Sequence, residues 1–203
     1  MSKLAINFEN VLTIKNELNK PLKEIFSLLK ASGISALDIM YDKVENQSYL
    51  SEILTSNFEI STIFHMSNLG VKDNFSKEME IIDFCLLHKI KRIFLITNPV
   101  YKEGDNEYLK NLVQNLKRIV KYAKNYDIKI CIENFGTESS PFSTLNRVVG
   151  ILKKVKGLGL VFDTGNFVLA GESPKNCLNE LIEYISSVHL KDRGEAIDGS
   201  KFI

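Results

Sequence analysis

Three residues whose side chains could bind a metal ion stand at the ends of three successive segments with a strand pattern. Glu133 ends "IKICIE", Asp163 ends "LGLVFD", and His189 follows "SSV". They lie 30 and 26 residues apart, which is close to the roughly 30 residues of one strand-helix-strand unit. Successive parallel strands would therefore bring two carboxylates and an imidazole to the same edge of a sheet.

This combination of side chains favours a divalent cation as the shared ligand. A charged group directly after a buried strand is costly to desolvate unless it is paired or bound to a metal, and two neighbouring acids repel each other without a cation between them. Oxygen and imidazole ligands without thiolate suit Mn²⁺, Mg²⁺, Co²⁺ or Zn²⁺, and the sequence does not choose among them. Each residue could instead cap a turn or pair with a lysine, but three residues in matched positions favour one site.

The segments around these residues alternate between strand and helix patterns. Strands that alternate with helices indicate parallel packing, either in an open doubly wound sheet or in a (β/α) barrel. No glycine-rich phosphate fingerprint follows the first strand, where the sequence reads "NFENVLT", so the barrel is favoured. The patterns predict seven strands, at 3–8, 36–41, 58–65, 91–97, 128–135, 158–162 and 186–192, and helices near 22–35, 46–57, 75–89, 106–125, 143–154 and 175–184.

Composition narrows the class of protein. The 203 residues, 44% of them hydrophobic, can form one domain over residues 1–203. A net charge of +1 provides no excess of positive charge for binding nucleic acid or an anionic membrane. No apolar run approaches the roughly 18 residues of a membrane span, and the first residues lack a signal-peptide core, so we expect a cytoplasmic protein. Cys85, Cys131 and Cys177 are expected to be buried free thiols.

The motifs "ICIENFG", "GLVFDTGNFVLAGESP" and "SVHLKDR" resemble those of the xylose isomerase-like TIM barrel superfamily, in particular its sugar phosphate isomerases and epimerases, with endonuclease IV as a more distant relative. The order of strands and helices fits as well, so the resemblance covers most of the chain. It implies an α/β fold of the TIM barrel type, in which Glu133, Asp163 and His189 bind the catalytic divalent metal. Relatives often carry His three residues after the metal-binding Asp, where this chain has Asn166, and this departure weakens the case for endonuclease chemistry.

The resemblance also implies a reaction. Such enzymes bind an α-hydroxy carbonyl sugar, and the metal stabilises the enediolate that forms when a carboxylate removes the carbon-bound proton. Glu133 is the expected base, serving as ligand and base together. Epimerisation in this family uses a second Glu at the end of the eighth strand, but only 11 residues follow Asp192, too few for a further helix and strand.

We therefore expect a barrel that is incomplete at its C-terminus, with seven strands. Either the sequence is a truncated version of a longer protein, or the fold survives with its first and seventh strands open. The first and seventh strands would then be open edges, which invite pairing. A homodimer that covers these edges is a reasonable hypothesis.

Five further residues are candidates for substrate contact: His65, Asn134, Asn166, Lys191 and Asp192. His65 ends the third strand, where relatives often place a His that faces the substrate or a second metal, although it could equally be a hydrogen-bonded loop histidine. Asn134, Lys191 and Asp192 adjoin the expected ligands, so they could orient those ligands or touch the substrate, and a purely structural role is equally open.

Three functions remain in competition on the sequence alone. The leading one is a metal-dependent isomerase or epimerase that acts on a small sugar or sugar phosphate. An endonuclease IV-like phosphodiesterase would need several more His and acidic ligands, whereas the chain has three His in all and no basic surplus. The third is a catalytically impaired barrel fragment that only binds metal or sugar.

Overall fold

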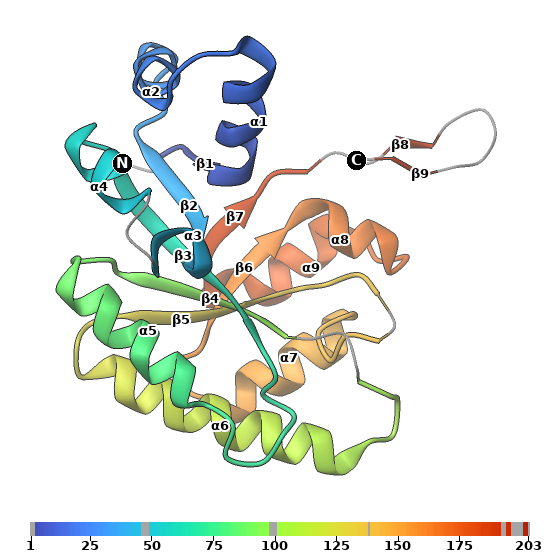
Figure 1. Cartoon of the computed structure of the whole chain (residues 1–203). Coiled ribbons are helices and arrows are strands. Elements are labelled where there is room, and N and C mark those ends of the chain that lie inside the picture. Colours follow the sequence, from blue (N-terminus) through green and yellow to red (C-terminus); the bar gives the residue numbers. More distant parts are fainter. Residues whose placement is uncertain are drawn as a thin grey trace.

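One parallel sheet organises the molecule (Figure 1). The computed structural model describes residues 3–45, 49–97, 101–137 and 139–191, together with the backbone of 194–195 and 201–202. Seven parallel strands follow one another across the sheet in chain order. They are β1 (Ala5–Asn7), β2 (Ala36–Met40), β3 (Glu59–Ser67), β4 (Arg92–Thr97), β5 (Lys129–Glu133), β6 (Gly159–Asp163) and β7 (Ile185–His189).

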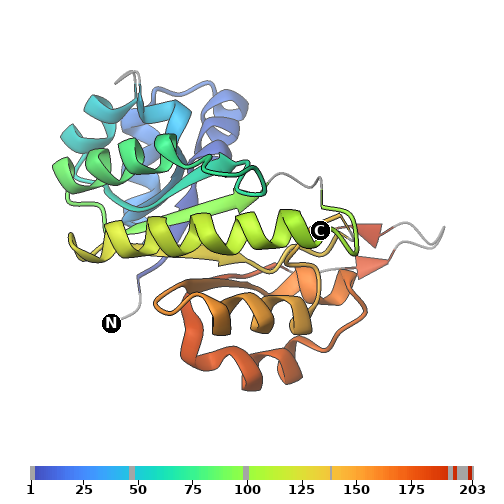
Figure 2. The same ribbon diagram turned by 90° about the horizontal axis from the view of Figure 1, so that it is seen from below.

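Helices connect the strands and lie on the outer side of the sheet. Figure 2 shows the long helix α6 running beside α5 across this outer side. A separate pair of two-residue strands, β8 (Gly194–Glu195) and β9 (Lys201–Phe202), is antiparallel. The helices are α1 (Phe8–Leu18), α2 (Leu22–Ala31), α3 (Tyr41–Glu45), α4 (Leu50–Thr55), α5 (Ser76–Leu87), α6 (Asn106–Lys124), α7 (Leu145–Lys154), α8 (Thr164–Leu169) and α9 (Pro174–Leu181), with a 3₁₀ turn, η1 (Ile182–Tyr184), after α9.

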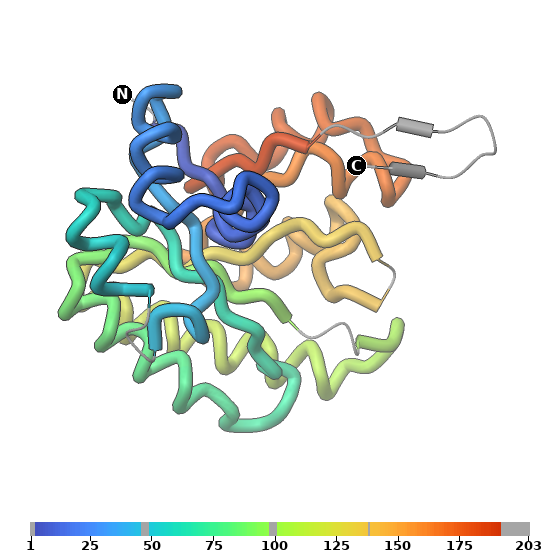
Figure 3. The backbone as a smooth tube through the Cα atoms, turned by 45° about the horizontal axis from the view of Figure 1, so that its top comes forward, coloured from blue at the N-terminus to red at the C-terminus, as the bar shows by residue number. Residues whose placement is uncertain are grey.

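The sheet curves into an open barrel. Figure 3 shows β7, in red, on the same side of the molecule as the N-terminal segment, in blue. Among the described strands, β1 and β7 are the two edges and do not pair with each other. The predicted fold class is confirmed, with its seven strands and its connecting helices. The single domain over 1–203 and the homodimer at the open edges stay predictions.

Alternation along each strand sorts side chains between two cores. On β2, Leu37 and Ile39 pack outward in the core between sheet and helices, whereas Met40 packs inward. The inner core is small and consists of Phe64, Phe94, Cys131 and Val161, with Met40 and Ile96 against it. Side chains of the same parity as these residues therefore point into the barrel, where they can form a site.

Three helices were not predicted, α1, α3 and α8, and each begins directly at the end of a strand. The Asn7 side chain accepts a hydrogen bond from the Glu9 N–H and so starts α1, while Asp163 caps α8. A capping side chain of this kind satisfies backbone N–H groups that lack a partner in the first turn. The helix predicted near 46–57 corresponds to α4, which α3 precedes, and residues 46–48 lie outside the described part of the chain.

Close packing inside the barrel predicts that Gly159→Ala is destabilising. A Cβ atom at Gly159 would lie 2.4 Å from Ser186 Oγ and 2.9 Å from Cys131 Sγ, so neighbouring atoms must move. We expect a loss of about 1–3 kcal/mol in the free energy of unfolding, measured by urea denaturation. The control is Gly150→Ala in α7, where a Cβ meets nothing within 4 Å and helix propensity should add about 0.5–1 kcal/mol. Equal effects of the two changes would contradict the packing described for the interior.

Candidate functional site

The structure brings Glu133, Asp163 and His189 together at the C-terminal ends of β5, β6 and β7. Each residue offers one ligand atom, and these atoms lie within 4.8 Å of one another. Asp163 pairs with His189 and Glu133 pairs with Val161, so all three residues share the inward-facing parity. Glu133 is 6% exposed and Asp163 is fully buried. Two buried carboxylates and an imidazole form a donor set that fits a divalent cation.

The Asp163 carboxylate divides its two oxygens between two tasks. Oδ1 accepts hydrogen bonds of 2.9 Å from the N–H groups of Gly165 and Asn166, which start α8. Oδ2 is buried and accepts no well-directed hydrogen bond, but Lys191 Nζ lies 2.6 Å away as an ion pair. The ammonium thus compensates the charge of Oδ2 by proximity, although the angles of the contact differ from those of a hydrogen bond. Helix capping thus fixes the carboxylate and turns Oδ2 towards positive charge.

Both alternatives to a metal site, a cap and a lysine pair, are therefore realised at Asp163. Neither excludes a metal, because capping uses only Oδ1 and Lys191 can leave: its side chain is about one-third exposed. The ammonium lies where a cation is needed to offset a buried charge. A metal ion bound to Oδ2 would displace it.

Asn134 and Asn166 hold the ends of β5 and β6 together. Asn134 Nδ2 donates to the Asp163 carbonyl at 2.9 Å, and Asn134 Oδ1 accepts from the Asp163 N–H at 2.8 Å. Asn166 Nδ2 donates to the Asn134 carbonyl at 2.9 Å. The backbone pairing of these strands ends at Glu133 and Val161, so the Asn134 amide continues it by one step. Contact of either asparagine with substrate stays a prediction, and the structure gives both amides a positioning role.

His189 contacts Glu133 directly and rests on the inner core. Its Nδ1 meets Glu133 Oε1, and its ring lies 5.8 Å from the Phe64 ring and 6.0 Å from the Phe94 ring, centre to centre. Burial raises the pKa of the Glu133 carboxyl, and the bond to His189 opposes this. Burial lowers the pKa of His189, but the bond to Glu133 and the charges of Glu133, Asp38 and Asp163 outweigh it, so the pKa rises.

Thr164 is a site residue that the sequence analysis missed. Its hydroxyl donates to the Lys191 carbonyl at 2.7 Å and accepts from the Lys191 N–H at 2.9 Å, which holds the chain after β7 beside β6. This tie places the Lys191 ammonium next to Asp163. Only the adjacency of Thr164 to Asp163 could have suggested it. Asp192, a predicted substrate contact, lies outside the described residues.

His65 is not brought into this group. It follows inward-facing Phe64 on β3, so its imidazole points to the outer side, where Nε2 lies 3.8 Å from Glu78 Oε1 of α5. Its ring packs against Tyr41 with 6.4 Å between the ring centres. Burial lowers the pKa of His65, and the charge of Glu78 opposes this. Its placement favours the structural interpretation, and substrate contact stays an untested prediction.

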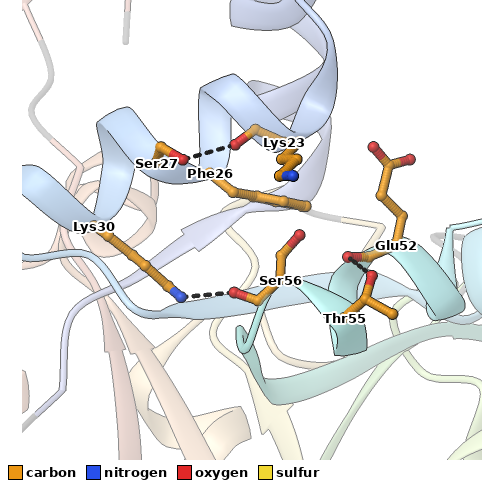
Figure 4. Close-up of a pocket in the computed structure, with 7 residues that line it drawn as sticks. All are labelled: Lys23, Phe26, Ser27, Lys30, Glu52, Thr55 and Ser56. Atoms are coloured by element: carbon orange, nitrogen blue, oxygen red, sulfur yellow. Dashed lines mark hydrogen bonds between the residues drawn. The ribbon is translucent and has the colours of Figure 1, made fainter.

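A surface hollow lies apart from this group, between α2 and α4 (Figure 4). Its volume is about 390 Å³, but its polar groups serve the local backbone. Ser27 Oγ donates to the Lys23 carbonyl, Thr55 Oγ1 to the Glu52 carbonyl, and Lys30 Nζ to the Ser56 carbonyl. No acid or base converges on a common point here among the described residues, so the site at β5, β6 and β7 is the better candidate.

Comparison with known proteins agrees with this geometry. The family model described as "Xylose isomerase-like TIM barrel" matches residues 69–201. The chain belongs to this family. The resemblance inferred from the sequence is thereby confirmed. No helix in the described part of the chain is long and apolar enough to cross a membrane.

Individual members of the family and of its fold are similar to parts of the chain. An inosose dehydratase from Mesomycoplasma hyopneumoniae (strain 7448) is 32% identical over 108 residues, which are 51% of this chain and 36% of that protein. The match thus spans about a third of this relative's length. The probable 3-DHS dehydratase AsbF from Bacillus anthracis superposes with a TM-score of 0.76 at 14% identity, covering 97% of this chain and 75% of that one. The IOLI protein with a bound zinc atom gives 0.75 at 20% identity, covering 96% and 74%.

The structural likenesses show the fold, and the sequence likeness shows kinship with sugar-modifying enzymes. The protein is accordingly related to enzymes of this kind. A metal accompanies the fold in at least one neighbour, the zinc-containing IOLI structure. Whether this chain binds one depends on its own residues.

The two hydrogen bonds between the Asn134 amide and the Asp163 backbone predict that Asn134→Ala lowers the stability of the fold and disturbs the candidate site. The change leaves the buried N–H and carbonyl of Asp163 without their partners, which should cost about 1–3 kcal/mol in the free energy of unfolding for each unsatisfied group. Urea denaturation measures this loss. Asn179→Ala, on the exposed side of α9, is the matched control and should change stability little. A loss of stability no greater than that of the control would contradict the role given to these two hydrogen bonds.

Proposed function

We propose that the protein is a divalent-metal-dependent enzyme that removes the proton next to the carbonyl of a sugar, sugar phosphate or related polyhydroxy ketone, with isomerisation or epimerisation as the outcome. The observation that supports this proposal is the convergence of Glu133, Asp163 and His189 on one buried, inward-facing point. Three ligand atoms from successive strands suit a catalytic site, which leaves other coordination positions open to the substrate.

Glu133, Asp163 and His189 would hold the metal. When bound, the ion would supply Lewis acidity towards the carbonyl and hydroxyl oxygens of the substrate. Mn²⁺, Mg²⁺, Co²⁺ and Zn²⁺ all accept such a donor set. Lys191, which pairs with Asp163, would then be free to face an anionic substrate group such as a phosphate.

Glu133 is the proposed base. Burial raises the pKa of its carboxyl, so the carboxylate accepts a proton more readily than an exposed one does. Its contact with His189 holds the carboxylate in one orientation, and the apolar rings of Phe64 and Phe94 below His189 keep bulk water away from that side. A base that is fixed and partly desolvated in this way suits the abstraction of a weakly acidic carbon-bound proton.

Loss of water is the second candidate outcome, and it is favoured by the inosose dehydratase relative, at 32% identity. Dehydration begins with the same removal of a proton next to a carbonyl, and a hydroxyl on the following carbon then departs. In both reactions Glu133 would remove the same proton. They differ in whether the hydroxyl on the following carbon stays or departs. The product distinguishes them.

Metal binding tests the proposed ligands. We expect the wild-type protein to bind Mn²⁺ in isothermal titration calorimetry, and Glu133→Gln, Asp163→Asn and His189→Gln each to weaken binding by about 100-fold or more, because even partners outside the ligand set typically contribute 10- to 100-fold. Glu180→Gln, at an exposed position of α9, is the control and should bind as the wild type does. Equal affinity in all five proteins would refute the site.

Proton exchange tests the reaction. In D₂O with Mn²⁺, the wild-type protein should transfer deuterium to the carbon beside the carbonyl of at least one compound in a panel of inosose, ketoses and ketose phosphates, followed by NMR. Glu133→Gln should slow this exchange by about 10²- to 10⁴-fold. An isomeric product supports the leading reaction, and a product lighter by one water supports dehydration. Cleavage of abasic-site DNA without any exchange would instead support the phosphodiesterase.

A further inference from the structure

A third inward-facing carboxylate, that of Asp38 on β2, points into the barrel. Asp38 lies between Leu37 and Ile39, which pack outward, and two residues before Met40, which packs inward. Its partner across the sheet is Thr62 of β3, two residues before inward-facing Phe64. Strand alternation therefore gives Asp38 the same inward parity as Glu133, Asp163 and His189.

The Asp38 carboxylate is buried without full satisfaction of its oxygens. It is 8% exposed, and its Oδ1 is buried without a hydrogen-bond partner in the described structure. An unsatisfied buried oxygen of this kind costs free energy, and its retention calls for an explanation such as a catalytic role or a bound ion or water. In the sequence, Asp38 is the single charged residue of the apolar run "ALDIM", which is the signal that could have identified it.

The Arg92 guanidinium does not neutralise this carboxylate by a direct ion pair. Arg92 of β4 directs Nη1 to Ser61 Oγ and Thr62 Oγ1, each at 3.3 Å, and among the described residues it forms no direct ion pair with Asp38. Burial raises the pKa of Asp38, opposed by the Thr62 hydroxyl and by the charges of His189 and Arg92. The carboxyl thus keeps its proton more readily than an exposed aspartate does.

Asp38 is also linked to the candidate site. Its charge acts on His189, and this electrostatic influence is mutual. Phe64, which follows Thr62 by two residues on the same face, is in ring contact with His189 at 5.8 Å. Asp38 and the Glu133–His189 pair therefore both face the barrel interior within electrostatic range of each other, with different surroundings for the two carboxyl groups. Carboxyl groups with different neighbours can divide the roles of acid and base between them.

We propose that Asp38 is the second proton-transfer residue of the site, a carboxylic acid that donates its proton to a substrate oxygen while Glu133 accepts one from the adjacent carbon. The inference rests on the proposed function and deepens it. In the step, the C–H bond breaks and its proton goes to the Glu133 carboxylate. The C–H electron pair forms a C=C bond, the carbonyl π pair takes the Asp38 proton to form O–H, and Asp38 is left as a carboxylate. No redox partner is needed.

The test compares Asp38→Asn with Asp42→Asn, a control on the exposed side of α3. Three quantities are measured for each: the Tm, the Mn²⁺ affinity, and kcat and KM for deuterium exchange into the compound that the wild-type protein accepts. For Asp38→Asn we expect a Tm close to that of the wild type, because a neutral amide of similar size replaces a carboxylic acid, and Mn²⁺ affinity close to that of the wild type. We expect kcat to fall by about 100-fold or more with little change in KM. Asp38→Glu, which restores a carboxyl, should recover at least part of this loss.

Several results would overturn the assignment. Exchange by Asp38→Asn at nearly the wild-type rate removes Asp38 from the chemistry and leaves the proposed function standing. A lower Tm together with equal losses in Asp38→Asn and Asp38→Glu shows a structural role only. If the wild-type protein itself binds Mn²⁺ but exchanges no proton in any compound of the panel, the proposed function fails, and the proton-donor role of Asp38 fails with it.

Discussion

A fully buried carboxylate at the end of β6 is the constraint on which the candidate site depends. Asp163 has no exposed surface, and a buried charge is tolerated only when hydrogen bonds and an opposite charge compensate its desolvation. Two N–H groups at the start of α8 satisfy Oδ1, and the Lys191 ammonium faces Oδ2. The Asn134 amide holds the Asp163 backbone. These contacts hold the carboxylate in place, and they leave one oxygen directed at a cation.

The lysine gives the site a way to exist with and without metal. In the structure Lys191 supplies the positive charge beside Asp163. Lys191 is held through its backbone by Thr164, whereas its partly exposed side chain can move. Replacement of the ammonium by a divalent ion would then free Lys191 to face the substrate. The same residue would thus compensate the charge of Asp163 without metal and contact the substrate with it.

Much of the fold and the central residues of the site could be predicted because the ends of strands can be recognised in the sequence. Glu133, Asp163 and His189 each follow a short apolar run, and parallel strands in chain order necessarily bring such ends together. Side chains that both end a strand and cap the following helix were harder to interpret. Asp163 and Asn7 cap helices that begin within one residue of a strand, so α8 and α1 have no separate sequence signal. His65 shows the other limit, because parity within a strand, set by the register and bulge of β3, decides which side of the sheet a strand-end residue faces.

The claim that one cation binds between Glu133, Asp163 and His189 is tested most directly by anomalous diffraction from crystals of the protein grown with Mn²⁺. The account predicts a single strong peak at about 2.0–2.3 Å from a carboxylate oxygen of Glu133, a carboxylate oxygen of Asp163 and a ring nitrogen of His189, with Lys191 Nζ moved away from Asp163. A Lys191–Asp163 ion pair that persists with no metal at these three residues, at a Mn²⁺ concentration that saturates binding in solution, would contradict it.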